Sequence, residues 1–457
     1  METHHHKRSA FSGKLGFVLS AAGASVGLGN IWRFPYLAAK YGGGIFLLIY
    51  IILAVTFGYT MIMAETALGR MTKKSPVGAF SAFGKGPGLS FGGWINAIIP
   101  ILIVPYYSVI GGWVIKYLVE YLRGGGSALA QDGYFSEFIS SGVSVELCFV
   151  VFTLFTLGII YAGVRNGVER VSKCMMPVLA VLSVIIAVYS VTRPGALAGV
   201  KYFLVPNLDN FSWMTVVAAM GQMFYSLSIA MGILITFGSY MKKDVSIEGS
   251  TTNVEIFDTA IAIMAGLMII PAVFAFSGGD PDTLQAGPAL MFITIPKVFD
   301  SMGMGTVVGV MFFLLVLFAA VTSSIALTES AVSTFEDELG WKRHKSTLLI
   351  GVIMVALGSL SALGYGPLGS VTVFGMQFLD LFDFLTNSVM MPIAAIATCL
   401  LVSRVVGVDK IEEEVTQKGG QFRRKAVFNF MIRYLCPLFA AIILVSSVAN
   451  ALGWIKM

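Results

Sequence analysis

Long runs of hydrophobic residues follow one another along the chain, separated by short breaks rich in polar residues, glycine or proline. Most runs hold roughly 20 residues or more, which is the length an α-helix needs to cross the hydrocarbon core of a bilayer. A transmembrane β-barrel would show shorter segments with alternating apolar and polar residues. The pattern therefore predicts an all-α membrane protein with about eleven transmembrane helices. The predicted spans are residues 14–37, 43–70, 92–123, 146–163, 168–192, 213–241, 254–277, 302–335, 346–364, 376–403 and 428–454.

The first and the sixth span are both interrupted near their centres. The first contains "GASVGLGNIWRFPY", and the sixth contains "GQMFYSLSIAMGILITFGSY", in which Ser226, Ser228 and Gly232 interrupt the apolar run. Interruptions at corresponding positions of two halves indicate a transporter built from an inverted repeat, here 5+5 helices, with its site at the bilayer midplane. The alternative is that small residues only allow close helix packing, which explains one such span more readily than two.

This repeat, together with the loops, gives the expected organisation of the chain. The basic residues gather on one side when the N-terminus is placed in the cytoplasm, as cytoplasmic loops require, and an odd number of spans then places the C-terminus outside. The expected segments are a cytoplasmic tail (1–13), a first repeat with spans one to five (14–192), an extracellular loop (193–212), a second repeat with spans six to ten (213–403), a cytoplasmic loop (404–427), and the eleventh span with the C-terminus (428–457).

A helix that breaks within lipid exposes backbone groups that hydrocarbon cannot satisfy. Free carbonyl groups suit a dehydrated Na⁺, and the N-termini of half-helices suit a carboxylate. The pair Gly27 and Gly29 in the first break therefore predicts a site where a cation and an anion bind side by side.

Other spans carry further polar residues at membrane depth. Asp258 lies in the seventh span, where a carboxylate is costly and should face a partner, unless it lies at a solvated helix end. The Thr-Ser-Ser sequence at 322–324 lies in the eighth span, although hydroxyl groups there often bond only to their own helix. Asp380 and Asp383 lie one turn apart in the tenth span, and Arg33 is a candidate partner for one of them. Together these residues describe a polar chamber lined by several helices.

Composition and charge narrow the function. Of 457 residues, 56% are hydrophobic and only 12% are charged, whereas soluble domains carry about 25% charged residues. The net charge of +5 is modest and gives no indication of nucleic-acid binding. We interpret the four cysteines as free thiols because they lack metal-ligand spacing, and residues 4–6, a histidine run, as a terminal tail. The only other histidine, His344, lies in a basic loop, so no catalytic or metal-ligating set points to an enzyme.

The chain resembles bacterial neurotransmitter:sodium symporters, which have the LeuT-type fold. The most specific stretch is "GASVGLGNIWRFPYLAAKYGGGIFLL" with the downstream "ETALGR", and "TSSIA" and "FEDELG" support it. The resemblance covers nearly the whole chain. It implies a Na⁺-coupled amino acid symporter that works by alternating access in the bacterial inner (plasma) membrane.

The same resemblance implies roles for individual residues. The first Na⁺ site is expected to consist of the substrate carboxylate with Ser25, Asn30, Ser226 and Asp258. The second Na⁺ site is expected to consist of Gly23, Val26, Ala319, Thr322 and Ser323. The expected substrate-binding residues are Ser25, Gly27, Gly29, Tyr107, Tyr225, Ser226, Ser228, Met231, Ser324 and Leu327. The expected gates are Arg33 with Asp383 on the outside, and Arg8 with Asp337 and Tyr240 on the inside.

Four details of this chain refine the picture. Family members that carry monoamines have an aspartate where this chain has Gly27, so an amino acid that brings its own carboxylate is favoured. Animal members add negative charge as chloride, and Asp258 is expected to replace it, which predicts no chloride requirement. Gly167 and Pro177 in the fifth span resemble a segment that unwinds in some relatives, although a plain kink is the alternative. Many relatives also have a twelfth span, whereas eleven are expected here.

We therefore expect import of large aliphatic and aromatic L-amino acids with two Na⁺ ions. The apolar side chains of Tyr107, Tyr225 and Leu327 line the expected site, and the unbranched Met231 can repack around different ligands. A non-transporting amino acid sensor on the same fold, or a symporter for another class of amino acid, is the alternative. The expected partners are the small-molecule substrate and the lipid bilayer, with no nucleic acid and no obligate protein partner.

Overall fold

A computed structural model describes residues 9–278, 287–451 and 453–454, and in this part of the chain the regular structure is helical. Nine of its helices are long and apolar enough to cross a membrane, and one bent pair makes a tenth span. Helices α12 and α13, counted as one interrupted span, make an eleventh. The predicted all-α membrane architecture is therefore confirmed.

The spans follow the predicted order with small shifts at their ends. Spans one to five are α1 (Lys14–Ser25) with η1 (Gly29–Arg33) and α2 (Phe34–Lys40); α3 (Gly44–Leu53) with η2 (Ala54–Gly58) and α4 (Tyr59–Thr72); α6 (Pro87–Leu122); α9 (Gly142–Tyr161); and η3 (Val164–Glu169) with α10 (Arg170–Val191). Spans six to eight are α12 (Trp213–Ser226) with α13 (Ile233–Tyr240); α14 (Ile247–Ser277); and α16 (Gly305–Leu339). Spans nine to eleven are α17 (Arg343–Leu363); α18 (Phe378–Asp383) with η7 (Phe384–Met390), α19 (Met391–Leu400) and η8 (Leu401–Val406); and α21 (Lys425–Phe430) with η10 (Met431–Leu435) and α22 (Cys436–Ala451).

Short helices fill the connections between the spans. They are α5 (Pro76–Ser81), α7 (Gly126–Leu129), α8 (Tyr134–Ser140), α11 (Ala196–Leu204), η4 (Leu208–Asn210), η6 (Leu290–Thr294), α15 (Ile295–Asp300), α20 (Val408–Thr416) and η9 (Gln417–Gly419). The limits of the predicted repeats and loops stay predictions, and residues 1–8 of the expected tail lie outside the described part of the chain.

Both predicted interruptions are present. In the first span, α1 ends at Ser25, Val26 has an extended backbone, and the chain bends by 55° before it continues as a helix. In the sixth span, α12 ends at Ser226, and Ser228, Ala230 and Gly232 have positive φ angles of 51°, 58° and 71°. Residues other than glycine rarely adopt this conformation, so the break of the sixth span is held by its surroundings rather than by local preference.

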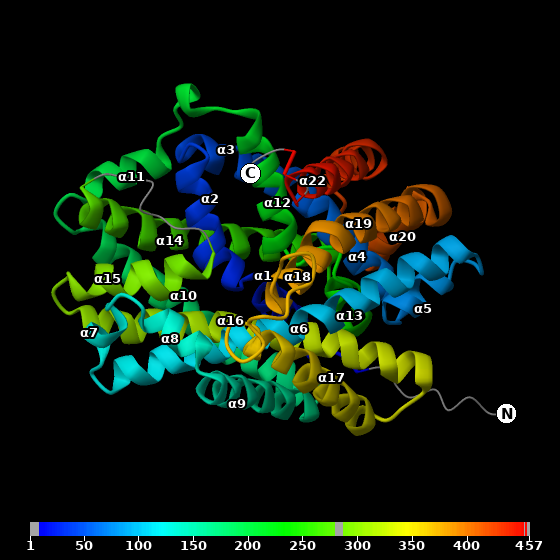
Figure 1. The fold of residues 1–457 in the computed structure, drawn as a ribbon. Helices are drawn as coiled ribbons and strands as arrows, with labels where there is room; N and C mark the ends of the chain where they lie inside the picture. Colours follow the sequence, from blue (N-terminus) through cyan, green and yellow to red (C-terminus); the bar gives the residue numbers. More distant parts are fainter. Residues whose placement is uncertain (1–8, 279–286, 452, 455–457) are drawn as a thin grey trace.

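The first span occupies the middle of the bundle (Figure 1). Every residue of α1 from Gly16 to Ser25 is buried, and several of them are Gly, Ala or Ser. Small residues let neighbouring helix backbones approach closely. Helices α4 and α13 also approach each other closely at glycines. A Cβ atom at Gly69 would collide with the backbone of Ile235, and one at Gly238 would collide with the backbone of Thr66.

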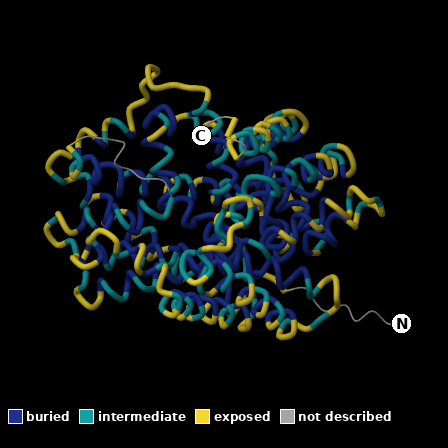
Figure 2. Tube along the Cα trace, viewed as in Figure 1, coloured by how far each residue is buried: buried dark blue, intermediate teal, exposed yellow. Residues whose placement is uncertain are grey.

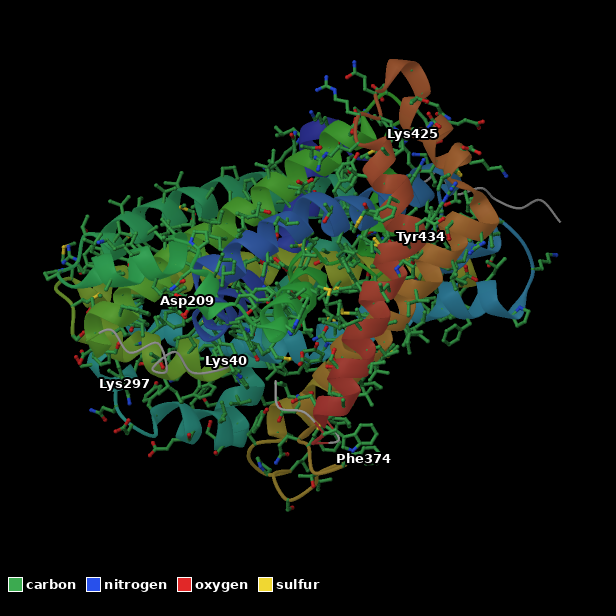
Figure 3. All side chains as sticks on the ribbon, turned by 90° about the horizontal axis from the view of Figure 1, so that it is seen from above. Lys40, Asp209, Lys297, Phe374, Lys425 and Tyr434 are labelled. Carbon is green, nitrogen blue, oxygen red and sulfur yellow. The ribbon has the colours of Figure 1, made fainter. Side chains whose placement is uncertain are left out.

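The C-terminal helix lies at the periphery. In its 18-residue apolar stretch only 28% is buried, against 78% in the corresponding stretch of α6 and 72% in that of α16. Figure 2 shows the same contrast between the buried centre and the exposed rim of the bundle. Tyr434, in the turn η10 of the same span, is 61% exposed (Figure 3). A membrane helix that is exposed and apolar faces lipid, so α22 flanks the bundle and does not line its centre.

Candidate functional site

The two helix breaks meet the seventh span at a cluster of buried polar side chains. The Nδ2 atom of Asn30 donates hydrogen bonds to Ser226 Oγ at 3.0 Å and to Asp258 Oδ1 at 2.9 Å. The Ser226 hydroxyl donates to Asp258 Oδ2 at 3.0 Å. Tyr50 on α3 donates to the same oxygen at 3.3 Å. These four polar side chains are essentially inaccessible to solvent.

The chemistry of this cluster suits a hard cation. Hydrogen-bond partners of the Asp258 carboxylate are the neutral groups of Asn30, Ser226 and Tyr50. A buried charge without an opposite charge is costly, and a cation among these oxygen atoms would compensate it. Carboxylate, amide, hydroxyl and carbonyl oxygens are the ligands that hard cations prefer. Ser25 lies beside this cluster at the end of α1, and its hydroxyl lies 3.3 Å from the carbonyl oxygen of Leu227 in the other break.

A second group of oxygen atoms lies where α16 passes α1. The Ser323 hydroxyl lies 3.2 Å from the carbonyl oxygen of Gly23 and 3.4 Å from that of Val26. The Thr322 hydroxyl lies 3.2 Å from the carbonyl oxygen of Ala319. A Cβ atom built on Gly23 would lie 3.1 Å from the Thr322 Cβ. The structure thus brings together all five residues predicted for the second Na⁺ site.

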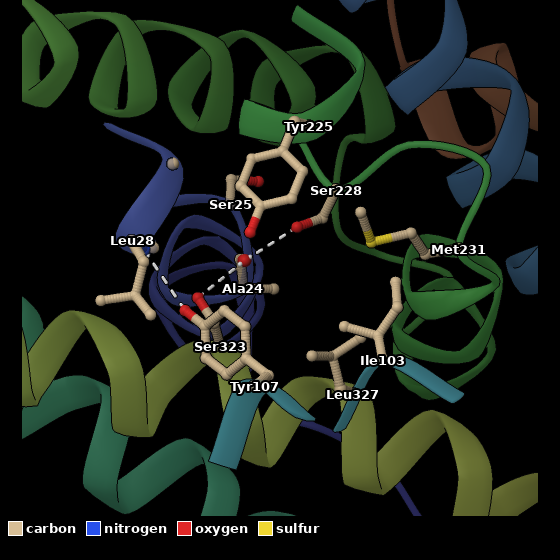
Figure 4. A pocket seen from close by; sticks show the side chains of 12 residues that line it. Ala24, Ser25, Leu28, Ile103, Tyr107, Tyr225, Ser228, Met231, Ser323 and Leu327 are labelled. Atoms are coloured by element: carbon tan, nitrogen blue, oxygen red, sulfur yellow. Dashed lines mark hydrogen bonds between the residues drawn. The ribbon is translucent and has the colours of Figure 1, made fainter. Parts of the chain in front are cut away.

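A cavity that measures about 350 Å³ including open solvent lies beside these two groups of oxygen atoms (Figure 4). Most of the predicted substrate residues line it, together with Ser323 and the additional residues Ala24, Leu28 and Ile103. The predicted residues that line it are Ser25, Gly27, Gly29, Tyr107, Tyr225, Ser228, Met231 and Leu327. The oxygen atoms of the broken helices therefore lie on one side of the cavity, and its apolar side is formed by Ile103 of α6, Leu327 of α16 and Met231 of the sixth-span break (Figure 4).

Two of the predicted substrate residues lie elsewhere. Ser226 belongs to the cluster around Asp258 and does not line the cavity. Ser324 is turned towards α9, where its hydroxyl lies 3.3 Å from that of Thr156. Adjacent helical residues point about 100° apart, so Ser323 and Ser324 cannot both face the cavity.

Glycine is required at two positions of this cavity. A Cβ atom at Gly27 would lie 2.7 Å from Ser323 Oγ and 3.0 Å from the Tyr107 hydroxyl. A Cβ atom at Gly29 would collide with the ring of Tyr225. Larger residues would therefore fill the cavity or displace its walls, so both glycines keep backbone atoms accessible to a ligand.

The backbone groups freed by the two breaks find polar partners around the cavity. The Leu28 amide donates to the Tyr107 hydroxyl at 3.3 Å, and the Ser228 hydroxyl donates to the carbonyl oxygen of Ala24 at 2.8 Å. The amide of Ala230 donates to Glu65 on α4 at 2.7 Å. Such partners allow irregular backbone within a membrane.

A wider vestibule lies above the cavity on the side where the first span ends. It measures about 2010 Å³ including open solvent, and Tyr225 lines both spaces and separates them. Arg33 and Asp383, the predicted outer gate, both line the vestibule. The Arg33 guanidinium lies 5.2 Å from the centre of the Tyr225 ring. Asp383 instead accepts hydrogen bonds from Asn387 at 2.6 Å and from Tyr106 at 3.2 Å.

The opposite, N-terminal side is closed by a polar network. The Tyr240 hydroxyl donates to Glu329 at 2.7 Å, and Arg343 forms an ion pair with the same carboxylate. The amide of the buried Phe11 donates to the carbonyl oxygen of Tyr240 at 3.1 Å. Asp337 accepts a hydrogen bond from the Ser75 amide at 2.6 Å. Its predicted partner, Arg8, lies outside the described residues.

The predicted unwinding segment of the fifth span lies next to the second group of oxygen atoms. Gly167 belongs to the π-helical turn η3, and Pro177 lies inside α10, so both have helical backbone in this structure. The Sδ atom of Met176 lies 3.3 Å from a Cβ atom built on Gly23. Unwinding of this segment stays a prediction. The segment lies beside Gly23, as it must if unwinding is to affect the second group of oxygen atoms.

Several residues of the site were not predicted from the sequence, and five of them show why. Glu65 and Glu329 are charged residues inside apolar spans, a signal that marks functional positions and was available in the sequence. Arg343, the partner of Glu329, lies in a basic loop where nothing distinguishes it from its neighbours. Tyr50 and Ile103 are ordinary residues of transmembrane helices, and only the fold assigns them to the site.

Comparisons with known proteins identify the family. The sequence profile of the Sodium:neurotransmitter symporter family matches residues 8–125 and 135–454. YhdH, an uncharacterized sodium-dependent transporter of Bacillus subtilis (strain 168), is 34% identical over 441 residues, covering 95% of this chain and 96% of YhdH. An uncharacterized sodium-dependent transporter of Haemophilus influenzae is 30% identical over 461 residues, covering 98% of this chain and 100% of that protein. The crystal structure of MhsT in complex with L-phenylalanine matches with a TM-score of 0.86 and 34% identity, covering 96% of this chain and 100% of that chain.

The chain therefore belongs to the sodium:neurotransmitter symporter family. It has the LeuT-type fold that the sequence predicted. It is a sodium-coupled transporter with several membrane-spanning helices, and it is not an enzyme.

Proposed function

We propose that this protein imports hydrophobic L-amino acids, including large aliphatic and aromatic ones, together with two Na⁺ ions and without chloride. The observation that carries the proposal is the cavity between the helix breaks, which has oxygen atoms on one side and Ile103, Tyr107, Met231 and Leu327 on the other. MhsT, which is similar over nearly its whole length, binds L-phenylalanine in its crystal structure.

The first Na⁺ ion is proposed to bind among Ser25, Asn30, Ser226 and Asp258. The substrate carboxylate would lie against the backbone of Gly27 and Gly29 and would complete the shell of this ion. Substrate and ion then bind as mutual ligands, so each strengthens the binding of the other. The second Na⁺ ion is proposed to bind at Ser323 and Thr322 with the carbonyl groups of Gly23, Val26 and Ala319.

Chloride independence follows from Asp258. Its carboxylate lies within the first cluster of oxygen atoms and brings a fixed negative charge. With the substrate carboxylate bound as well, a further anion such as chloride would meet two negative charges at short range and would be repelled. The same buried carboxylate faces a desolvation cost when the carrier returns empty, which protonation would relieve. Counter-transport of a proton is therefore part of the proposal.

Transport is proposed to occur by alternating access, with spans one, two, six and seven rocking as a bundle against spans three, four, eight and nine. The N-terminus is placed in the cytoplasm, so the network of Tyr240, Glu329 and Arg343 closes the cytoplasmic side. Two Na⁺ ions with a zwitterion carry two charges inward, and the proton that leaves in the return step removes one of them, so the net gain is roughly 2.3 kcal/mol per 100 mV. This corresponds to about a fiftyfold accumulation before the Na⁺ and proton gradients contribute.

Uptake into proteoliposomes tests the proposal. Purified protein is reconstituted, and uptake of labelled L-phenylalanine, L-leucine, L-tryptophan, L-aspartate, L-lysine and glycine is measured with and without an inward Na⁺ gradient, in chloride and in gluconate. The proposal predicts Na⁺-driven uptake of the first three amino acids that is equal in both anions. Saturable binding without uptake would favour a sensor, and a requirement for chloride would contradict the role given to Asp258.

A further inference from the structure

The segment that connects the tenth and eleventh spans, residues 407–424, belongs to neither of the two groups of helices that rock against each other. It contains the short helix α20, which lies beside α4 and the π-helical turn η8 (Figure 1). We call it the cytoplasmic segment. Its polar contacts show which of the two groups holds it.

Glu414 on α20 makes the first attachment. Its carboxylate is only 3% exposed and pairs with Arg70 Nε at 2.7 Å, and the Arg70 side chain is 1% exposed. Lys243 Nζ lies 2.7 and 2.8 Å from the two carboxylate oxygens. Breaking a buried pair by removing one partner is strongly destabilising, because the other charge stays buried. Glu414 is therefore tightly held by these two cations.

Arg70 extends this attachment to a third element. It lies near the end of α4, and its Nη1 atom donates to the carbonyl oxygen of Val245 at 2.6 Å. Its Nη2 atom donates to the backbone carbonyl of Glu414. Lys243 and Val245 both lie in the loop between α13 and α14. One arginine thus joins the second span, the connection between the sixth and seventh spans, and α20.

A second attachment lies at the other end of the cytoplasmic segment. Glu248 on α14 accepts the backbone amides of Arg423 at 2.9 Å and of Arg424 at 3.1 Å. The Arg424 guanidinium lies 3.8 Å from the centre of the Tyr59 ring on α4 and pairs with Glu255 on α14 at 3.0 Å. Every partner in both attachments comes from spans two and seven or from the loop that leads into span seven.

The tenth span is irregular where it meets the cytoplasmic segment, and the eleventh span is irregular after its first short helix, α21. The tenth span ends in the π-helical turn η8, and the eleventh span contains the π-helical turn η10. Gly407, which follows η8, has a φ angle of 87°, a conformation that glycine adopts without strain. Turns of this kind often occur at functional positions of helices. They provide places where spans ten and eleven can bend relative to the segment.

We propose that the cytoplasmic segment moves with the bundle of spans one, two, six and seven, and that Glu414 is the positioning residue that couples it to this bundle. Spans ten and eleven then bend at η8 and η10 when the bundle rocks, so their cytoplasmic ends follow the transport cycle. The inference rests on the proposed rocking motion and adds to it the assignment of a segment that belongs to neither group of helices.

Distances between pairs of spin labels test this assignment in the full-length protein. Exposed positions are available on the segment (Lys410), on the bundle loop (Asp244) and at the start of α17 in the other group (Lys342). Each is replaced by cysteine after Cys148 and Cys174 are replaced by serine. The three pairwise distances are measured in Na⁺ with L-phenylalanine and in Na⁺-free buffer.

The proposal predicts that the distance from Asp244 to Lys342 changes between the two conditions. The distance from Lys410 to Lys342 should change with it, while the distance from Lys410 to Asp244 stays constant. If the segment followed Lys342 while the bundle moved, the proposal would be overturned and the rocking motion would stand. If the distance from Asp244 to Lys342 did not change, the rocking motion and the inference would fail together.

The role of Glu414 is tested by Glu414→Gln, with Glu413→Gln as the matched control. The control removes the same charge one residue away, on an exposed position of the same helix. We expect Glu414→Gln to broaden the distribution of distances between Lys410 and Asp244. We also expect it to lower the maximal uptake rate about tenfold, a size typical of coupling between sites, at an unchanged KM. Equal behaviour of the two variants would overturn the role of Glu414, and if Glu414→Gln failed to fold, the distances in the unaltered protein would still decide the assignment.

Discussion

Replacing Asp258 by asparagine removes the only formal charge that the four proposed side-chain residues bring to the first Na⁺ site, while keeping the shape of the site. The side chain lies 2.9 Å from Asn30 and 3.0 Å from the Ser226 hydroxyl, so an amide of equal size keeps contacts with both neighbours. What the variant loses is the attraction between the carboxylate and Na⁺. This attraction is about 4 kcal/mol for charges 4 Å apart at an effective dielectric constant of about 20.

Part of that attraction is offset, because the carboxylate must be desolvated in the empty site. We therefore expect a net loss of about 2 kcal/mol, which is roughly a thirtyfold higher Na⁺ concentration for half-maximal activation. The measurement is the Na⁺ dependence of L-phenylalanine binding to purified protein, in chloride and in gluconate. Asp209→Asn, in the exposed turn η4, is the control for loss of one negative charge.

A second consequence separates this explanation from simple damage to the fold. If Asp258 substitutes for an anion, the asparagine variant should bind substrate better in chloride than in gluconate, while the unaltered protein shows no difference. A variant whose Na⁺ activation stays within about twofold of the unaltered protein would refute the reasoning, since Asp258 would then not be a ligand of the first Na⁺.

Three further predictions follow from the same geometry. Gly27→Ala places a methyl group 2.7 Å from Ser323 Oγ, so the affinity for L-phenylalanine should fall about tenfold or more. Unchanged affinity in a binding titration would show that Gly27 does not border the substrate. Ser323→Ala removes a hydroxyl from the second group of oxygen atoms, so the Na⁺ concentration for half-maximal activation should rise about tenfold. The control Thr328→Ala loses only a hydrogen bond to its own helix and should leave this concentration unchanged. Lowering the internal pH should change Na⁺-driven uptake, and Asp258→Asn should abolish that effect; indifference of the unaltered protein to internal pH would refute proton counter-transport.

The membrane itself explains why so much of the fold was predictable. A span must be long, apolar and helical because lipid offers no partners for backbone groups, so hydropathy alone locates the eleven spans. The two breaks were predictable for the same reason. Gly27, Gly29 and the serines of the sixth span interrupt helices at a depth where lipid cannot bond the backbone groups that are set free. The carboxylate of Asp258 was detectable because a charge at that depth requires a partner.

Other contacts were not predictable, because tertiary packing selects their partners. Arg70 and Glu414 are 344 positions apart, and each looks like an ordinary charged residue near a helix end. Ser324 illustrates a finer limit, since neighbouring hydroxyls on one helix face different directions and only the rotation of α16 decides which one meets the cavity. The sequence locates the chemistry along the chain, and the fold assigns the partners.

Binding of two matched ligands tests most directly whether the broken helices hold a cation and a carboxylate together. L-phenylalanine and phenethylamine share the aromatic ring and the amine, but only the amino acid has a carboxylate. We expect L-phenylalanine to bind only when Na⁺ is present, and phenethylamine to bind neither in the presence nor in the absence of Na⁺. Equal binding of both ligands, or binding of L-phenylalanine that does not depend on Na⁺, would contradict it.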